Sequence, residues 1–265
     1  MATDIQSYIG TFPGISQVGR SRMHFAQSDP LAAFMADNRI AAIVQKKVLM
    51  ALGGLMPPYS TSDLAATIDG GTIANGANGI LFTTSTTNDH DQALNGNKTI
   101  ALAQDKWFTY LTVVQFSHAT SVGLRAGVVT SGGTEYFTAD ATDGVYFVKA
   151  KNAATLTARV VENGNAAVDL STFTLSDGTS GAFSFVAATR YVIGFRFKVG
   201  SSADLTAGEW IVNGVITKMS AAQITALRAM LATTAPTLCA HLGNRLDSTT
   251  SRTMTVDGIC VEADL

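Results

Sequence analysis

Residues 190–199 read RYVIGFRFKV, and this stretch decides the fold class. Side chains alternate between the two faces of an extended strand, so every second residue shares a face. One face takes aromatic and aliphatic residues: Tyr191, Ile193, Phe195, Phe197 and Val199. The other takes Arg190, Gly194, Arg196 and Lys198. The pattern predicts a strand with one dry face and one wet face, which is typical of an antiparallel sheet.

Eight further β-rich runs surround this strand between residues 80 and 261. In Trp107–Phe116, Leu111 and Val113 add apolar residues to the second face, so we expect both faces to be covered. Asn-Gly or Asp-Gly occurs at nine positions after residue 60, and these dipeptides favour tight hairpin turns. The other runs are Ile80–Thr84, Val122–Val129, Val145–Ala150, Thr155–Val161, Phe183–Ala187, Trp210–Ile216 and Thr253–Val261.

One short helix is predicted late among the strands. Ser220 and Gln223 form a capping box before an apolar helical stripe, and Pro236 closes the segment. Many strands without alternating helices exclude a doubly wound fold and favour two packed antiparallel sheets. We therefore predict an all-β chain in which residues 61–265 form an antiparallel β-sandwich with this helix inserted.

Residues 1–60 have a different character. Met1–Phe25 is predicted to be an extended arm, and Asp29 with Pro30 marks the start of an amphipathic helix that runs to Leu52. The apolar stripe of this helix packs either on its own domain or on a neighbouring subunit. In the second case it is an assembly interface, formed by Leu31, Phe34, Met35, Ile43, Val44 and Val48.

The chain is poor in charge. Charged residues make up 14% of its 265 residues, against roughly 25% in an ordinary soluble domain, and hydrophobic residues make up 46%. We therefore expect part of the surface to be buried in an assembly. The net charge of −2 and the absence of a long Lys/Arg run argue against nucleic acid as a partner. No stretch predicts a membrane span or a secretory signal, so we expect synthesis in the cytoplasm.

Common catalytic and cofactor signatures are absent from the sequence. It contains no G-x-S-x-G, no phosphate-binding glycine loop, no H-E-x-x-H and no C-x-x-C. The four histidines have no spacing typical of a zinc site: His24, His90, His118 and His241. We expect no enzymatic activity, no cofactor and no bound metal.

One polar loop and one aromatic residue suggest an alternative. Asp89 and Asp91 flank His90 in a Thr/Asn-rich loop, where their oxygens are of the type that calcium prefers. Tyr136 follows Gly132-Gly133 and is the best candidate for an exposed ring. These three residues, Tyr136, Asp89 and Asp91, are candidate glycan contacts, although a solvated turn is the simpler explanation of the two aspartates.

Four ordered motifs carry a resemblance to a known family. The motifs are 143–147 (DGVYF), 158–164 (ARVVENG), 191–195 (YVIGF) and 210–215 (WIVNGV), followed by a closing strand at 256–262. With these motifs, the chain resembles the concanavalin A-like, laminin G-like jelly rolls of tailed-bacteriophage virion proteins over about residues 75–265. The cation and sugar residues of the lectin members have no matching motif here.

The resemblance implies a jelly-roll fold and a structural role in a virion. The expected function is that of a capsid decoration (cement) protein that binds the major capsid protein or other virion proteins on the outer capsid surface. We expect a homo-oligomer, and specifically a trimer. The alternative is a receptor- or glycan-binding module of a tail fibre or spike.

Overall fold

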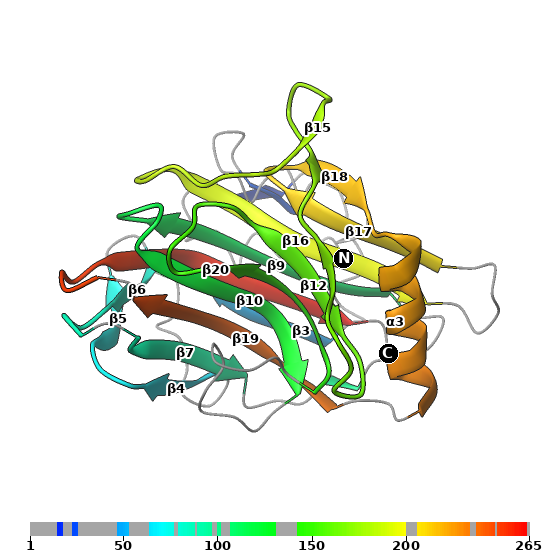
Figure 1. Ribbon diagram of the computed structural model, residues 1–265, viewed down its shortest axis with the longest axis horizontal. Helices are drawn as coiled ribbons and strands as arrows, with labels where there is room; N and C mark the ends of the chain where they lie inside the picture. Colours follow the sequence, from blue (N-terminus) through cyan, green and yellow to red (C-terminus); the bar gives the residue numbers. More distant parts are fainter. Residues whose placement is uncertain are drawn as a thin grey trace.

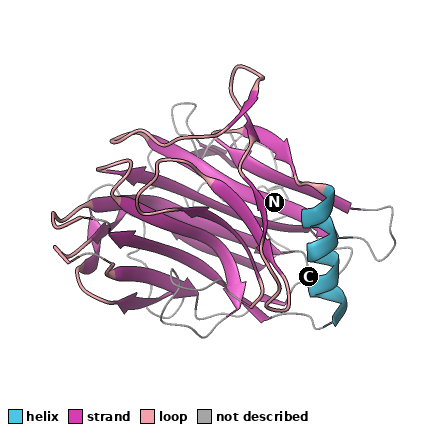
Figure 2. Cartoon of the chain, in the orientation of Figure 1, coloured by secondary structure: helices cyan, strands magenta, loops and turns pink. Residues whose placement is uncertain are grey.

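A computed structural model of the chain describes most of residues 64–263, together with three short strands nearer the start. The described residues are 15–17, 23–25, 47–52, 64–76, 79–87, 89–96, 100–101, 107–130, 142–199, 206–233, 237–246 and 248–263. Nearly all of these residues lie in antiparallel strands and their turns (Figure 2). This confirms the predicted all-β class.

Two eight-stranded antiparallel sheets pack face to face (Figure 1). Sheet I has the order β13-β12-β11-β10-β19-β7-β4, with β8 also paired to β19. Its strands are β4 (Leu64–Ile68), β7 (Asp91–Gly96), β8 (Ile100–Ala101), β10 (Val122–Thr130), β11 (Gly144–Lys149), β12 (Thr157–Val161), β13 (Val168–Leu170) and β19 (Thr237–Leu246).

Sheet II has the order β18-β17-β16-β9-β20-β6-β5, with β3 also paired to β20. Its strands are β3 (Lys47–Leu52), β5 (Thr72–Gly76), β6 (Gly79–Thr83), β9 (Trp107–Phe116), β16 (Arg190–Val199), β17 (Thr206–Val212), β18 (Val215–Lys218) and β20 (Thr253–Ala263). Two small hairpins lie outside the sandwich sheets: β1 (Ile15–Gln17) with β2 (Met23–Phe25), and β14 (Phe173–Thr174) with β15 (Ser180–Gly181).

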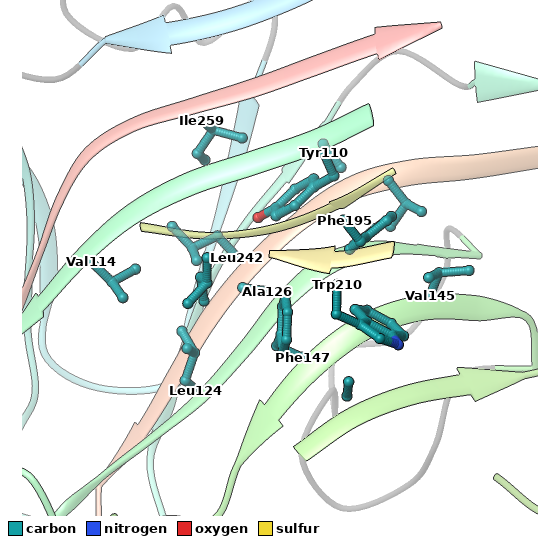
Figure 3. Packing of buried hydrophobic residues seen from close by; sticks show 14 of the residues in the cluster. Tyr110, Val114, Leu124, Ala126, Val145, Phe147, Phe195, Trp210, Leu242 and Ile259 are labelled. Carbon is teal, nitrogen blue, oxygen red and sulfur yellow. The ribbon is translucent and has the colours of Figure 1, made fainter. Parts of the chain in front are cut away.

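The facing sides of the two sheets form one hydrophobic core (Figure 3). Trp210 of β17 meets Phe147 of β11 and Phe195 of β16 edge-on, with ring centroids 5.0 and 5.4 Å apart. These edge-to-face contacts add to the free energy gained by burying the rings. The strand that decides the fold class therefore has its aromatic face in the core, as its alternation predicts.

The predicted late helix is confirmed as α3 (Ala221–Thr233), the one helix among the described residues. Its capping box is formed. The backbone N–H of Gln223 donates to Ser220 Oγ at 3.2 Å, and the backbone N–H of Ser220 donates to Gln223 Oε1 at 3.2 Å. The helix contacts β12, β13 and β16, and so closes one end of the sandwich (Figure 1).

The predicted N-terminal helix is wrong over its last six residues. Lys47–Leu52 form β3, where Val48 lies opposite Glu262 of β20. Periodicity alone does not separate a short apolar run such as 48–52 from a strand, and β20 extends past the end of β6 to offer a partner. The other predicted interface residues lie outside the described part of the chain: Leu31, Phe34, Met35, Ile43 and Val44.

Candidate functional site

Four side chains gather on the outer face of sheet I, which is the face turned away from the core. Tyr146 of β11, His241 of β19 and Asn95 of β7 share one row across the strands, with Gly127 of β10 between Tyr146 and His241. Arg125 of β10 lies two residues before Gly127 and therefore on the same face. We call Arg125, Tyr146, His241 and Asn95 the outer-face cluster.

Direct contacts hold the outer-face cluster together. The Arg125 guanidinium carbon lies 5.0 Å from the centroid of the Tyr146 ring, within the range of a cation–π contact. His241 Nδ1 and Asn95 Oδ1 are 2.7 Å apart, a hydrogen bond in which the ring nitrogen donates. A Cβ atom on Gly127 would lie 2.5 Å from Tyr146 Cα, so glycine permits the close approach of β10 and β11.

The centre of this face is closed to solvent. Arg125, Tyr146 and His241 are 3%, 0% and 1% exposed. Burial, with a smaller contribution from the Arg125 charge, lowers the pKa of His241 to about 3. The imidazole is therefore neutral near pH 7, with one nitrogen able to donate and one able to accept a hydrogen bond.

A second group of charges lies at the loop end of the same sheet. Asp89 occupies a turn with φ of 68° and pairs with both Lys151 and Arg245, whose Nη2 atom is 3.1 Å from Asp89 Oδ1. Arg245 Nε also lies 3.3 Å from Asp91 Oδ1. We call Asp89, Asp91, Lys151 and Arg245 the end cluster.

The two aspartates of the end cluster differ in their surroundings. The hydrogen bond from Lys151 is the main cause that lowers the pKa of the exposed Asp89. Burial raises the pKa of Asp91 to about 6, although Arg245 acts in the opposite direction. Because two cations already neutralise Asp89, its carboxylate is a poor starting point for a calcium site. Within the described ranges, no group of three or more His, Cys, Asp or Glu side chains is placed to hold a metal ion.

The predicted glycan contacts are only partly brought together. Asp89 and Asp91 lie side by side in the end cluster, whereas Tyr136 falls in the segment 131–141, outside the described residues. The outer-face cluster was not predicted from the sequence. Its one available signal was the alternation at 122–129, which puts Arg125 on the same face as Gly123 and Gly127 and opposite the apolar positions.

Solved structures identify the architecture. The carbohydrate recognition domain of Emp47p aligns with 82% of this chain and 95% of its own at 10% identity and a TM-score of 0.53. The globular domain of T. cruzi calreticulin aligns with 83% and 89% at 11% identity and a TM-score of 0.52. Peanut lectin aligns with 82% and 97% at 11% identity and a TM-score of 0.50. The sandwich is a concanavalin A-like jelly roll.

This result confirms the predicted jelly-roll fold. At identities of 10–11% the likeness concerns the fold, and sheet architecture of this kind hosts many unrelated functions. No family model matches the chain, and no curated protein matches it. No helix in the described part of the chain has the length and apolar character needed to cross a membrane.

Proposed function

We propose that this chain is a non-enzymatic structural protein of a virion, of the capsid-decoration type. In this role it binds the major capsid protein or other virion proteins on the outer capsid surface and stabilises the head lattice, as a homo-oligomer. The low charge of the sequence and the motif order at 143–215 support this role. Interfaces that hold permanent assemblies are large and apolar, with few charges at their centre.

The observation that carries the proposal is the lack of an open binding platform on the described sheet faces. Every described aromatic side chain is buried or half-buried, and the exposed large hydrophobic residues of the described part are Val186 and Ile216. At the centre of the outer face of sheet II, Leu111 and Val113 of β9 are also closed to solvent, at 0% and 2% exposed. A sandwich closed in this way suits contacts made through its loops, edges and added segments.

Counting copies in intact particles tests the decoration role. We expect quantitative mass spectrometry of the virus to give a copy number that is a simple fraction of that of the major capsid protein. Light scattering of the purified chain is expected to give the mass of a trimer. A handful of copies per particle would eliminate the decoration role, whatever the oligomeric state.

A second candidate is a glycan-binding module of a tail fibre or spike. The end cluster favours it, because it presents Asp89 at a loop of a sandwich that shares its fold with a lectin and a carbohydrate recognition domain. Binding on a broad glycan array, lost on Tyr136→Ala or Asp89→Ala and kept on Asp177→Ala, would support this candidate. The absence of binding to any glycan of the array, with and without calcium, would exclude this candidate.

A further inference from the structure

The interior of the sandwich contains a pair of neighbouring side-chain amides. Gln92 of β7 and Asn244 of β19 are direct partners in the strand register, and both are 0% exposed. The core residues Leu94 and Leu242 lie two positions away on the same strands, so both amides point between the two sheets. Directly opposed residues have Cβ atoms about 4.5–5.5 Å apart, so the two side chains are neighbours.

The hydrogen bonds of this pair are incomplete. Gln92 Nε2 donates to the carbonyl oxygens of Gly70 and Thr83, at 3.0 and 2.6 Å. Gln92 Oε1 accepts no hydrogen bond from the protein. Neither Asn244 Oδ1 nor Asn244 Nδ2 has a protein partner. Two adjacent buried amides thus hold two acceptors and one donor without partners, although they do not bond to each other.

Such an arrangement is unfavourable unless a bound molecule supplies the missing hydrogen bonds. Buried polar atoms in folded proteins are almost always satisfied, by the chain itself or by ordered water. We propose that a water molecule is bound between the two sheets, where it donates to Asn244 Oδ1 and to Gln92 Oε1 and accepts from Asn244 Nδ2.

The residues beside the two amides favour water over an ion as the bound molecule. Across the strands of sheet I, Asn244 is followed by its partner Leu124 of β10 and then by Lys149 of β11, so no carboxylate lies in this row to compensate a cation. An anion would face the carbonyl oxygens of two amides. A neutral molecule that both donates and accepts fits all three atoms, and buried waters typically make about three such bonds.

The position of the site bears on how the water exchanges with solvent. The next pair along β7 and β19 is Asp91 with Arg245, which belongs to the end cluster on the outer face. The bound water therefore lies one strand residue from the loop end of the sandwich. Because the amides are fully buried, its release requires local opening of that end, so we expect a long residence time.

Magnetic relaxation dispersion of water oxygen-17 counts long-lived internal waters and tests the proposal. Asn244→Leu keeps a similar volume but removes both amide atoms, and we expect this variant to show one long-lived water fewer than the wild type. Gln115→Leu removes an amide bonded to the Ala188 carbonyl at the surface and is expected to leave the count unchanged. Equal counts in wild type and Asn244→Leu would overturn the proposal.

A measurement on the wild type keeps the proposal testable if Asn244→Leu does not fold. A high-resolution crystal structure is expected to show a water peak about 3 Å from the Asn244 amide and from Gln92 Oε1. Clear density for both side chains with no peak between them would refute the site. A direct bond between the two amides in that structure would refute it equally.

Discussion

Gln223→Met is expected to lower the free energy of unfolding by about 3–5 kcal/mol, because buried groups that lose their partners each cost about 1–3 kcal/mol. Gln223 Oε1 accepts from Trp210 Nε1 of β17 at 3.1 Å, and Nε2 donates to the carbonyl oxygens of Ala158 and Val168 at 3.2 and 3.3 Å. One amide thus joins α3 to strands of both sheets. Methionine keeps the volume and removes all of these bonds.

Denaturant unfolding followed by tryptophan fluorescence measures this change. Gln115→Met is the matched control, since its amide bonds a single surface carbonyl and a surface change of this kind alters stability by about 0.5 kcal/mol. A loss below about 1 kcal/mol in Gln223→Met, comparable to the net value of one ordinary hydrogen bond, would show that α3 docks through its apolar contacts alone.

Lys149→Met is expected to raise stability below pH 7 and to remove a pH dependence above it. Lys149 is 0% exposed, its Nζ donates to the Val122 carbonyl and lies 5.4 Å from the Phe116 ring centroid, and burial lowers its pKa to about 7. Above pH 7 the unfolded chain keeps a proton that the folded chain has lost. Stability therefore rises with pH, by up to about 1.4 kcal/mol per pH unit, until the unfolded lysine also loses its proton near pH 10.5.

Unfolding free energies measured at intervals from pH 5 to pH 10 test this expectation. Below pH 7 the ammonium is protonated in both states and the folded chain carries its full burial cost, so Lys149→Met is more stable there by up to about 5 kcal/mol, at about 1.4 kcal/mol for each pH unit between the two pKa values. Lys218→Met, at an exposed position of β18, is expected to keep the slope of the wild type. Parallel curves for wild type and Lys149→Met would show that Lys149 stays charged inside the sandwich.

Sequence patterns located the strands whose two faces are unambiguous. β9 and β16 have the predicted bounds, and the burial of Leu111 and Val113 confirms that both faces of β9 are covered. The capping box predicted the start of α3 because its hydrogen bonds are local. Local chemistry is what a single sequence records best.

The turn dipeptides of the sequence have different outcomes. Asn213-Gly214, within the run 210–216, forms the hairpin turn that the dipeptide predicts, with positive φ angles of 51° and 79° between β17 and β18. Asp257-Gly258, a turn signal by composition, instead lies inside β20 at a register shift between Val256 and Gly258. Asn95-Gly96 likewise ends β7 within the sheet. Pairing on both sides overrides the turn preference of these last two dipeptides.

The candidate site shows the same limit. Asp89 and Asp91 were found because they are adjacent in sequence, and Arg245 was missed because β19 brings it across from the far end of the chain. His241 lies within β19, and its ring forms a hydrogen bond with Asn95. The alternation of β19 places His241 on the face opposite Leu238, Ala240 and Leu242, but nothing local in the sequence identifies Asn95 of β7 as its neighbour.

The strand order has a consequence for how the chain is made. β19 and β20 are inner strands of sheets I and II, yet both are encoded after residue 236. While a ribosome is still translating, β7 and β10 have no shared neighbour, and β6 and β9 are also unjoined. Half-built sheets offer unpaired edges to other nascent chains, and such distant pairings form slowly. We therefore expect the yield of folded protein to rise when expression is slow and a chaperone that binds nascent chains at the ribosome is co-expressed.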